Sequence, residues 1–190
     1  MKRLTATLLF MTSLAALLAA QSLIARVEGD QLRIAAPRLH FLVGESLIRL
    51  RDGATVRYAF QLTARADRTG RVLARSEEQF AVSYDLWEEK FAIARLGASP
   101  KSVSHLSTAA AEAWCVDNTA LPIAGLNVNQ QFWVRLDYRT DDSAPPVDAS
   151  ENSSFTLSAL IDIFSRRTRN ELVHGAEEIG PLRLDTLKKR

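Results

Sequence analysis

The chain has 190 residues, of which 47% are hydrophobic and 24% charged, and its formal net charge at pH 7 is +2. This length suits one domain with a substantial core. Lys2 and Arg3 account for the excess positive charge, since the remaining chain has 22 basic and 22 acidic residues. Overall charge therefore argues against nucleic-acid binding, which depends on a basic surface.

The first twenty residues have the layout of a secretory signal peptide. Two cations precede an apolar run from Leu8 to Leu18, and small residues follow. The cleavage point is near Ala20 or Ser22, and the apolar run is shorter than the roughly 20 residues that a membrane-spanning helix needs. We expect a signal peptide over residues 1–20, a single exported globular domain over residues 21–190 that is periplasmic or secreted, and no transmembrane span in the mature chain.

The single cysteine limits what can stabilise the exported domain. Cys115 has no second cysteine with which to form an intramolecular disulfide bond, so packing has to supply the stability. Free cysteine is among the most buried residue types, and we expect Cys115 to be buried. A nucleophilic thiol would need a base, for which His105 is the nearest histidine in the sequence.

Strand patterns dominate the first half of the exported domain. The segment 23–36 predicts a β-hairpin with its turn at Gly29-Asp30, and a short helix is expected to end at Asp52-Gly53. Alternating apolar residues then predict a strand over 56–63 and an antiparallel partner over 72–84.

The segment SYDLWEEKFAIARL, residues 83–96, places a tryptophan beside two glutamates. The alternation of apolar residues breaks off after Tyr84 and resumes at Phe91, so the residues between them predict a chain reversal between neighbouring strands. We expect the acids of this segment to lie in water on the turn, without a facing partner.

Two alternatives concern the side chains of this turn. Glu88 and Glu89 are adjacent, and adjacent side chains on a strand point to opposite faces, so they are poorly arranged as an acid and base. Trp87 is expected to cover an edge of the core because its ring is large and apolar, and stacking on a sugar is the other use of such a ring.

The second half of the chain mixes helix and strand patterns. An alanine-rich helix with Leu106, Ala110, Ala113 and Trp114 on one face is predicted over 107–118, capped by Ser107 or Thr108, with a loop over 119–131. Residues 132–139 predict the clearest strand, with Trp133, Arg135 and Asp137 sharing its polar face. A polar loop over 143–154, a helix over 157–164, a turn at 180–181 and a last strand over 182–187 complete the pattern.

Together these elements predict an α+β fold. A mainly antiparallel β-sheet or β-sandwich-like domain of five to seven strands is expected, with two or three short helices packed on it. The order of a signal peptide, the strands VRYAFQL and FAVSYDLWEEKFAI, an alanine-rich helix and FWVRLDYR resembles an uncharacterised family of exported bacterial proteins of about this length. The resemblance implies a location in the bacterial envelope and carries over no catalytic residue.

No motif in the sequence defines a reaction. The three histidines, His40, His105 and His174, lie in separate segments rather than at the close spacing of metal ligands. No nucleotide-binding glycine motif or nucleophile elbow occurs, and the paired acids are all sequence neighbours. We therefore predict no catalytic residue, no metal ligand and no cofactor.

The function expected from these observations is non-catalytic. We predict a binding or adaptor module of the bacterial envelope, with an unknown envelope protein or ligand as partner and with Trp87, Trp133 and Arg135 as the candidate binding surface. Two alternatives stay open. One is an exported hydrolase that uses Cys115 with His105 or a carboxylate pair near Trp87, and the other is a small-ligand carrier with a cavity between sheet and helices.

Overall fold

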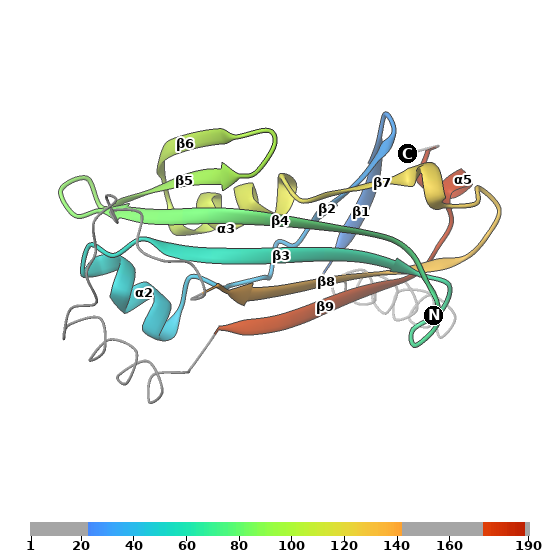
Figure 1. Cartoon of the computed structure of the whole chain (residues 1–190), viewed down its shortest axis with the longest axis horizontal. Coiled ribbons are helices and arrows are strands. Elements are labelled where there is room, and N and C mark those ends of the chain that lie inside the picture. Colours follow the sequence, from blue (N-terminus) through green and yellow to red (C-terminus); the bar gives the residue numbers. More distant parts are fainter. Residues whose placement is uncertain (1–22, 142–172, 189–190) are drawn as a thin grey trace, which may run out of the picture.

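The computed structural model describes residues 23–141 and 173–188, which form two antiparallel sheets with short helices packed on them (Figure 1). The larger sheet has six strands in the order β6-β5-β4-β3-β8-β9, and the smaller has three in the order β1-β2-β7. The predicted α+β fold with a mainly antiparallel sheet is confirmed. The predicted signal peptide, the loop at 143–154 and the helix at 157–164 lie outside the described residues.

The bounds of the elements follow the chain. The strands are β1 (Ile24–Glu28), β2 (Gln31–Ala35), β3 (Val56–Arg65), β4 (Val72–Asp85), β5 (Lys90–Leu96), β6 (Lys101–Leu106), β7 (Ala120–Pro122), β8 (Phe132–Thr140) and β9 (His174–Leu182). The helices are α2 (Gly44–Arg51), α3 (Thr108–Asp117) and α5 (Leu184–Leu187), with a 3-10 turn, η2 (Ile123–Gly125). None of the described helices has the length and apolar character needed to span a membrane.

The long β3–β4 hairpin forms the middle of the larger sheet. Its register pairs Val56 with Val82 and Tyr58 with Phe80, so the apolar positions of both strands fall on the same face. That face is covered by α3, by the smaller sheet and by the connection between β2 and α2 (Figure 1). The β4–β5 turn projects from one end of the sheet and the β3–β4 turn from the other (Figure 1).

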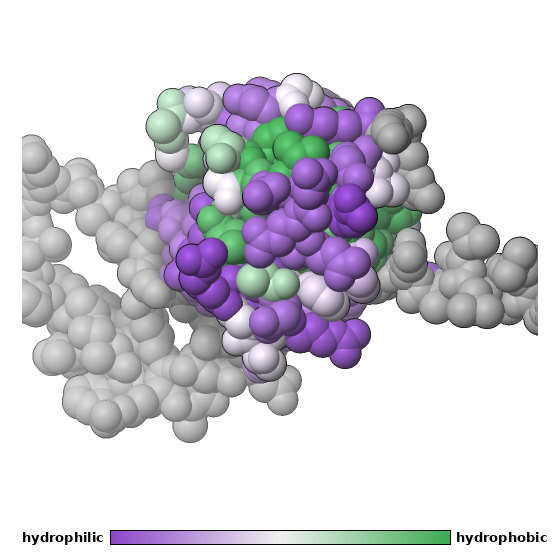
Figure 2. Space-filling model, turned by 90° about the vertical axis from the view of Figure 1, so that its right-hand side faces the viewer, coloured by the Kyte–Doolittle hydropathy of each residue, from purple (hydrophilic) through white to green (hydrophobic). Residues whose placement is uncertain are grey.

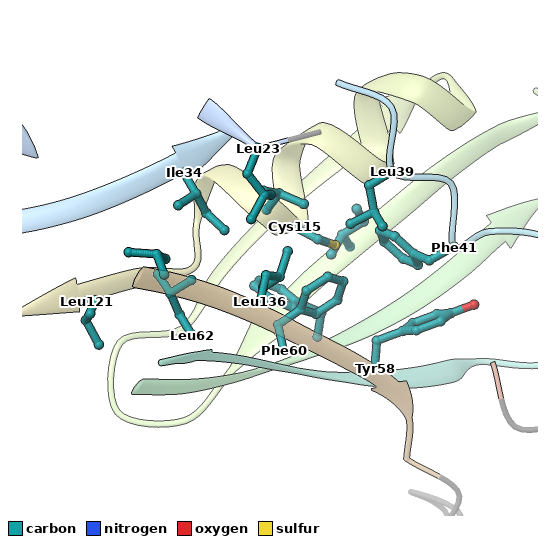
Figure 3. Packing of buried hydrophobic residues seen from close by; sticks show 14 of the residues in the cluster. Leu23, Ile34, Leu39, Phe41, Tyr58, Phe60, Leu62, Cys115, Leu121 and Leu136 are labelled. Carbon is teal, nitrogen blue, oxygen red and sulfur yellow. The ribbon is translucent and has the colours of Figure 1, made fainter. Parts of the chain in front are cut away.

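The core lies between these two layers, as Figure 3 shows. Phe41, from the connection before α2, packs edge-on against Tyr58 and Phe60 of β3, with ring centroids 4.8 and 5.0 Å away. Leu136 of β8 and Cys115 of α3 lie in the same cluster (Figure 3). Such edge-to-face pairs are typical of buried aromatic rings.

Three strand predictions were wrong. Residues 101–106, for which no strand was predicted, form β6 at the edge of the larger sheet, and β7 pairs with β2 where a loop was predicted. Near the carboxyl end, β9 continues through Gly180 and Pro181, and residues 184–187 are helical rather than a strand. Pro181 fits because, among the described residues, β9 pairs with β8 alone, so the other edge of β9 needs no backbone donor there.

The alanine-rich helix was predicted with the correct bounds but the wrong buried face. Ser107 caps α3 as expected, since its hydroxyl accepts a hydrogen bond from the Ala110 amide at 3.3 Å. The residues that face the core are Ala111, Glu112, Cys115 and Val116, whereas Ala110 and Ala113 are exposed. Alanine is small and apolar on every side of this helix, so its pattern does not mark one face.

Candidate functional site

The turn Asp85–Glu89, between β4 and β5, is the most exposed aromatic feature of the described structure. Trp87 is 96% exposed and its neighbour Leu86 is 57% exposed. The backbone N–H groups of Trp87 and Glu88 donate to Oδ1 of Asp85 at 2.8 and 3.1 Å, which fixes the turn. These two bonds, that from Glu88 foremost, hold the pKa of Asp85 below its ordinary value.

The predicted chain reversal is present, and its acids are in contact with water as expected. The expectation that they lack a facing partner is wrong for Glu88, because Oε2 of Glu88 lies 2.8 Å from Nε2 of His105 on β6. Both side chains are more than half exposed, so this pair joins the turn to the sheet edge without an enclosed cleft. Trp87 does not cover the core edge, contrary to the prediction, because its ring points into solvent.

The three residues of the predicted binding surface do not lie together. Trp133 and Arg135 share one face of β8. Trp133 pairs with Arg65, the last residue of β3, at the end of the sheet opposite to Trp87. The 14 residues of β4 separate these two ends by about 40 Å at the usual rise of a strand. A single small contact surface therefore cannot include all three.

Trp133 and Arg135 are also occupied by intramolecular contacts. The Trp133 ring lies against Gly180, where an added Cβ atom would be only 2.6 Å from the ring. Arg135 donates from Nε to both carboxylate oxygens of Asp137, at 2.9 and 3.0 Å, and this bond raises its pKa. Trp87 is left as the member of the predicted surface that is free to contact a partner.

The residues of the thiol alternative lie in different environments. Cys115 is fully buried on the inner face of α3, and burial raises the pKa of its thiol, with a further contribution from the charge of Glu112. The predicted burial of Cys115 is confirmed. His105 has a side chain that is 69% exposed and contacts Glu88 on the surface. The structure does not bring the two groups together.

A buried carboxylate was missed by the sequence analysis. Oε1 of Glu112 accepts hydrogen bonds from the backbone amides of Phe41 and Leu42 at 2.8 and 3.0 Å, and Oε2 lies 3.0 Å from Nδ1 of His40. Glu112 therefore fastens the connection between β2 and α2 to α3. The available signal was a single acid, Glu112, within the otherwise uncharged run TAAAEAWCV. An acid that such a helix buries needs fixed hydrogen-bond partners.

One surface hollow of the described residues lies on the outer face of the larger sheet, opposite to the face that α3 covers. A shallow trough of about 310 Å³ runs over β4, β5 and β6, lined by Thr55, Ala81, Ser83, Ala92, Ile93, Ala94, Ser102, Val103 and Ser104. Within residues 23–141 and 173–188, no three histidine, cysteine or acidic side chains are grouped closely enough to hold a metal ion.

The end of the molecule opposite to Trp87 has a different surface. Figure 2 views this end and shows hydrophilic residues around a smaller hydrophobic area. Val72, at the start of β4, and Val128, between η2 and β8, are about half exposed here. Both are branched aliphatic side chains of modest size. The larger exposed side chain, the ring of Trp87, lies at the β4–β5 end.

Comparison with known proteins finds no family model that matches the chain, no curated protein similar to it in sequence, and no solved structure similar to it.

Proposed function

We propose that this protein is an exported bacterial envelope protein that binds a protein partner through the turn Asp85–Glu89. The observation that carries the proposal is the nearly complete exposure of Trp87 on a turn that Asp85 holds in one conformation. Tryptophan is enriched among the residues that dominate binding energy in protein interfaces. The hydrogen bonds to Asp85 order the backbone of the turn before binding, so less backbone freedom is lost when the ring is bound.

The location in the envelope rests on the sequence. The layout of residues 1–20 supports export, and the resemblance to exported bacterial proteins of about this length supports the same compartment. Binding by the folded domain requires no cofactor and no cleavage step.

The charges around Trp87 favour a protein partner over an anionic membrane surface. Asp85, Glu88 and Glu89 surround the ring in sequence, and Lys90 follows them, so the turn is acidic overall. Acids are repelled by anionic lipid headgroups. A pocket with apolar walls and basic residues at its rim is complementary to this turn.

The contribution of Trp87 to the free energy of binding can be estimated from the apolar area of its ring. Complete burial of a tryptophan removes about 150–250 Å² from water, which at about 25 cal/mol per Å² sets an upper limit of roughly 4–6 kcal/mol. Because association opposes part of this gain, we expect Trp87→Ala to weaken binding by about 2 kcal/mol, or about 30-fold. The stability of the isolated domain should not change, since the ring contacts little of it.

A photoreactive amino acid introduced at position 86 of the full-length protein in bacterial cells tests the proposal, because Leu86 is exposed beside Trp87 and the ring stays in place. A discrete adduct with a second protein is expected from position 86 and not from position 69, since Thr69 is exposed on the β3–β4 turn at the other end of the sheet. The adduct should weaken when Glu89→Lys reverses one charge of the turn. Equal adducts from both positions, or recovery of monomer alone, would contradict the proposal. Adducts formed with lipid alone would replace the protein partner with a membrane.

A further inference from the structure

Three side chains beside the Trp87 turn form a continuous hydrogen-bonded array. Oγ of Ser104 lies 2.8 Å from Nδ1 of His105, and Nε2 of His105 lies 2.8 Å from Oε2 of Glu88. An ionised glutamate only accepts hydrogen bonds, so neutral His105 carries its hydrogen on Nε2 and donates it to Glu88. Nδ1 is then the acceptor for the Ser104 hydroxyl. A hydroxyl, a base and a carboxylate that orients the base are the parts of an activated nucleophile.

The backbone holds the array in place. The pairing of β5 with β6 shifts between Phe91 and Ile93, so Ser104 and His105 together oppose a single residue of β5 in a β-bulge. His105 has φ of 63°, in the left-handed region that only glycine adopts without strain. Bulges and strained residues of this kind redirect side chains, and here His105 is directed to the β4–β5 turn.

Glu88 is fixed from the other side. Its backbone amide is bonded to Asp85, so the turn that carries its carboxylate is anchored to the end of β4. The array therefore joins β6 to a turn that is itself bonded to the end of β4, rather than lying within one loop.

Ser104 also lines the trough on the outer face of the sheet. Ala81, Ala92 and Ala94 form part of the trough, and their methyl groups leave an apolar floor next to the Ser104 hydroxyl. A volume of about 310 Å³ has room for a small acyl group and is open enough for the alcohol portion of an ester to remain in water.

From this geometry we propose that Ser104, His105 and Glu88 form an acyl-transfer site that hydrolyses small esters. Ser104 is the nucleophile, His105 is the general base, and Glu88 is a positioning residue that holds His105 in the required tautomer. This activity goes beyond the binding proposed for Trp87 and uses neighbouring side chains.

Hydrolysis of the ester proceeds in two steps, formation of acyl-serine and its hydrolysis by water. The Ser104 oxygen bonds to the carbonyl carbon of the ester while its proton passes to Nδ1 of His105. The bond between that carbon and the alcohol oxygen then breaks, the alcohol leaves with the proton, and acyl-serine remains. Water gives a proton to His105 and attacks the acyl group, after which the acid is released and the proton returns to Ser104.

The test uses the full-length mature protein and 4-nitrophenyl acetate as the probe. We expect hydrolysis that saturates with probe concentration and falls about 100-fold in Ser104→Ala and in His105→Gln, the usual range for a general base. Mass spectrometry of the rapidly quenched reaction should place one acetyl group on the peptide that contains Ser104. Ser99→Ala removes an exposed hydroxyl from the loop between β5 and β6 and should leave the rate unchanged.

The role of Glu88 is separated from a structural role by kinetics. Glu88→Gln should lower kcat with little change in KM, and Glu88→Asp should recover part of the loss because it restores a carboxylate. Glu45→Gln, which changes an exposed acid of α2 outside both proposed sites, is the matched control and should have no effect. Circular dichroism of each variant checks that the fold is retained.

Full activity in Ser104→Ala or in His105→Gln would overturn the proposal, as would an acetyl group found only on lysine side chains. The result is independent of partner binding: with the photoreactive residue at position 86, Trp87→Ala should weaken the adduct and keep ester hydrolysis. Conversely, Ser104→Ala should lose ester hydrolysis and still bind the partner through Trp87.

Discussion

The buried carboxylate of Glu112 gives the most direct test of how this fold is held together. In Glu112→Ala the amides of Phe41 and Leu42 lose their acceptor, and each unsatisfied buried donor costs about 1–3 kcal/mol. The loss of a buried methylene adds about 0.8 kcal/mol, while removal of a desolvated charge offsets part of the total. We expect a decrease of about 3 kcal/mol in the free energy of unfolding.

Two further variants separate the parts of this interaction. Glu112→Gln keeps an oxygen for both amides and nearly the same volume, so we expect a loss of about 1 kcal/mol, the difference between charged and neutral acceptors. His40→Ala removes only a side chain that is 66% exposed, for which we expect less than about 1 kcal/mol.

Urea unfolding followed by far-ultraviolet circular dichroism measures all three variants. Hydrogen exchange should show faster exchange of the Phe41 and Leu42 amides in Glu112→Ala than in the wild-type protein. Equal stabilities of the alanine and glutamine variants would refute the reasoning, because the predicted difference depends on the acceptor oxygen. A loss below about 1 kcal/mol in Glu112→Ala would show that the amides do not depend on this carboxylate.

The remaining predictions concern two other buried groups. Cys115 should not react with a thiol reagent at neutral pH in the folded protein, because the thiol is buried and burial raises its pKa. It should react once the protein is unfolded in urea. Rapid labelling of the native protein would contradict its placement on the inner face of α3. Tyr58→Phe should leave stability near neutral pH unchanged or slightly higher, since the buried hydroxyl has no hydrogen-bond partner of adequate geometry in the described structure. Burial raises the pKa of Tyr58 from 10.0 to about 12, so the unfolded chain loses this proton first, and the free energy of unfolding falls as the pH rises from 10 through about 12. Alkaline titration followed by circular dichroism should therefore show a smaller loss of stability in Tyr58→Phe than in the wild-type protein, and identical curves would contradict the burial of the hydroxyl as the cause.

The sequence alone was sufficient for most of the larger sheet. Alternation of apolar residues along β3, β4, β5 and β8 has a period of two, and a strand with one buried face requires that period whatever it packs against. The reversal at Asp85–Glu89 and the cap at Ser107 were also predictable, because turns and caps depend on a few neighbouring residues.

Edge elements were not predictable in the same way. The strands β6 and β7 are short and polar or small in composition, and each is a strand because a neighbouring strand supplies its hydrogen bonds. The buried face of α3 was likewise decided by what packs on it, since a run of alanines has no preferred side.

The candidate site depends on tertiary structure throughout. The sequence identified Trp87 and its neighbouring acids but placed the ring on the core edge, and it gave Glu88 no partner. Only the pairing of β5 with β6, with its bulge at Ser104 and His105, brings that histidine to Glu88. Glu112 meets the amides of Phe41 and Leu42 across 71 and 70 residues of sequence for the same reason. Local pattern determines which face of a strand is apolar, whereas contacts between segments are set by strand order and register, which no single segment encodes.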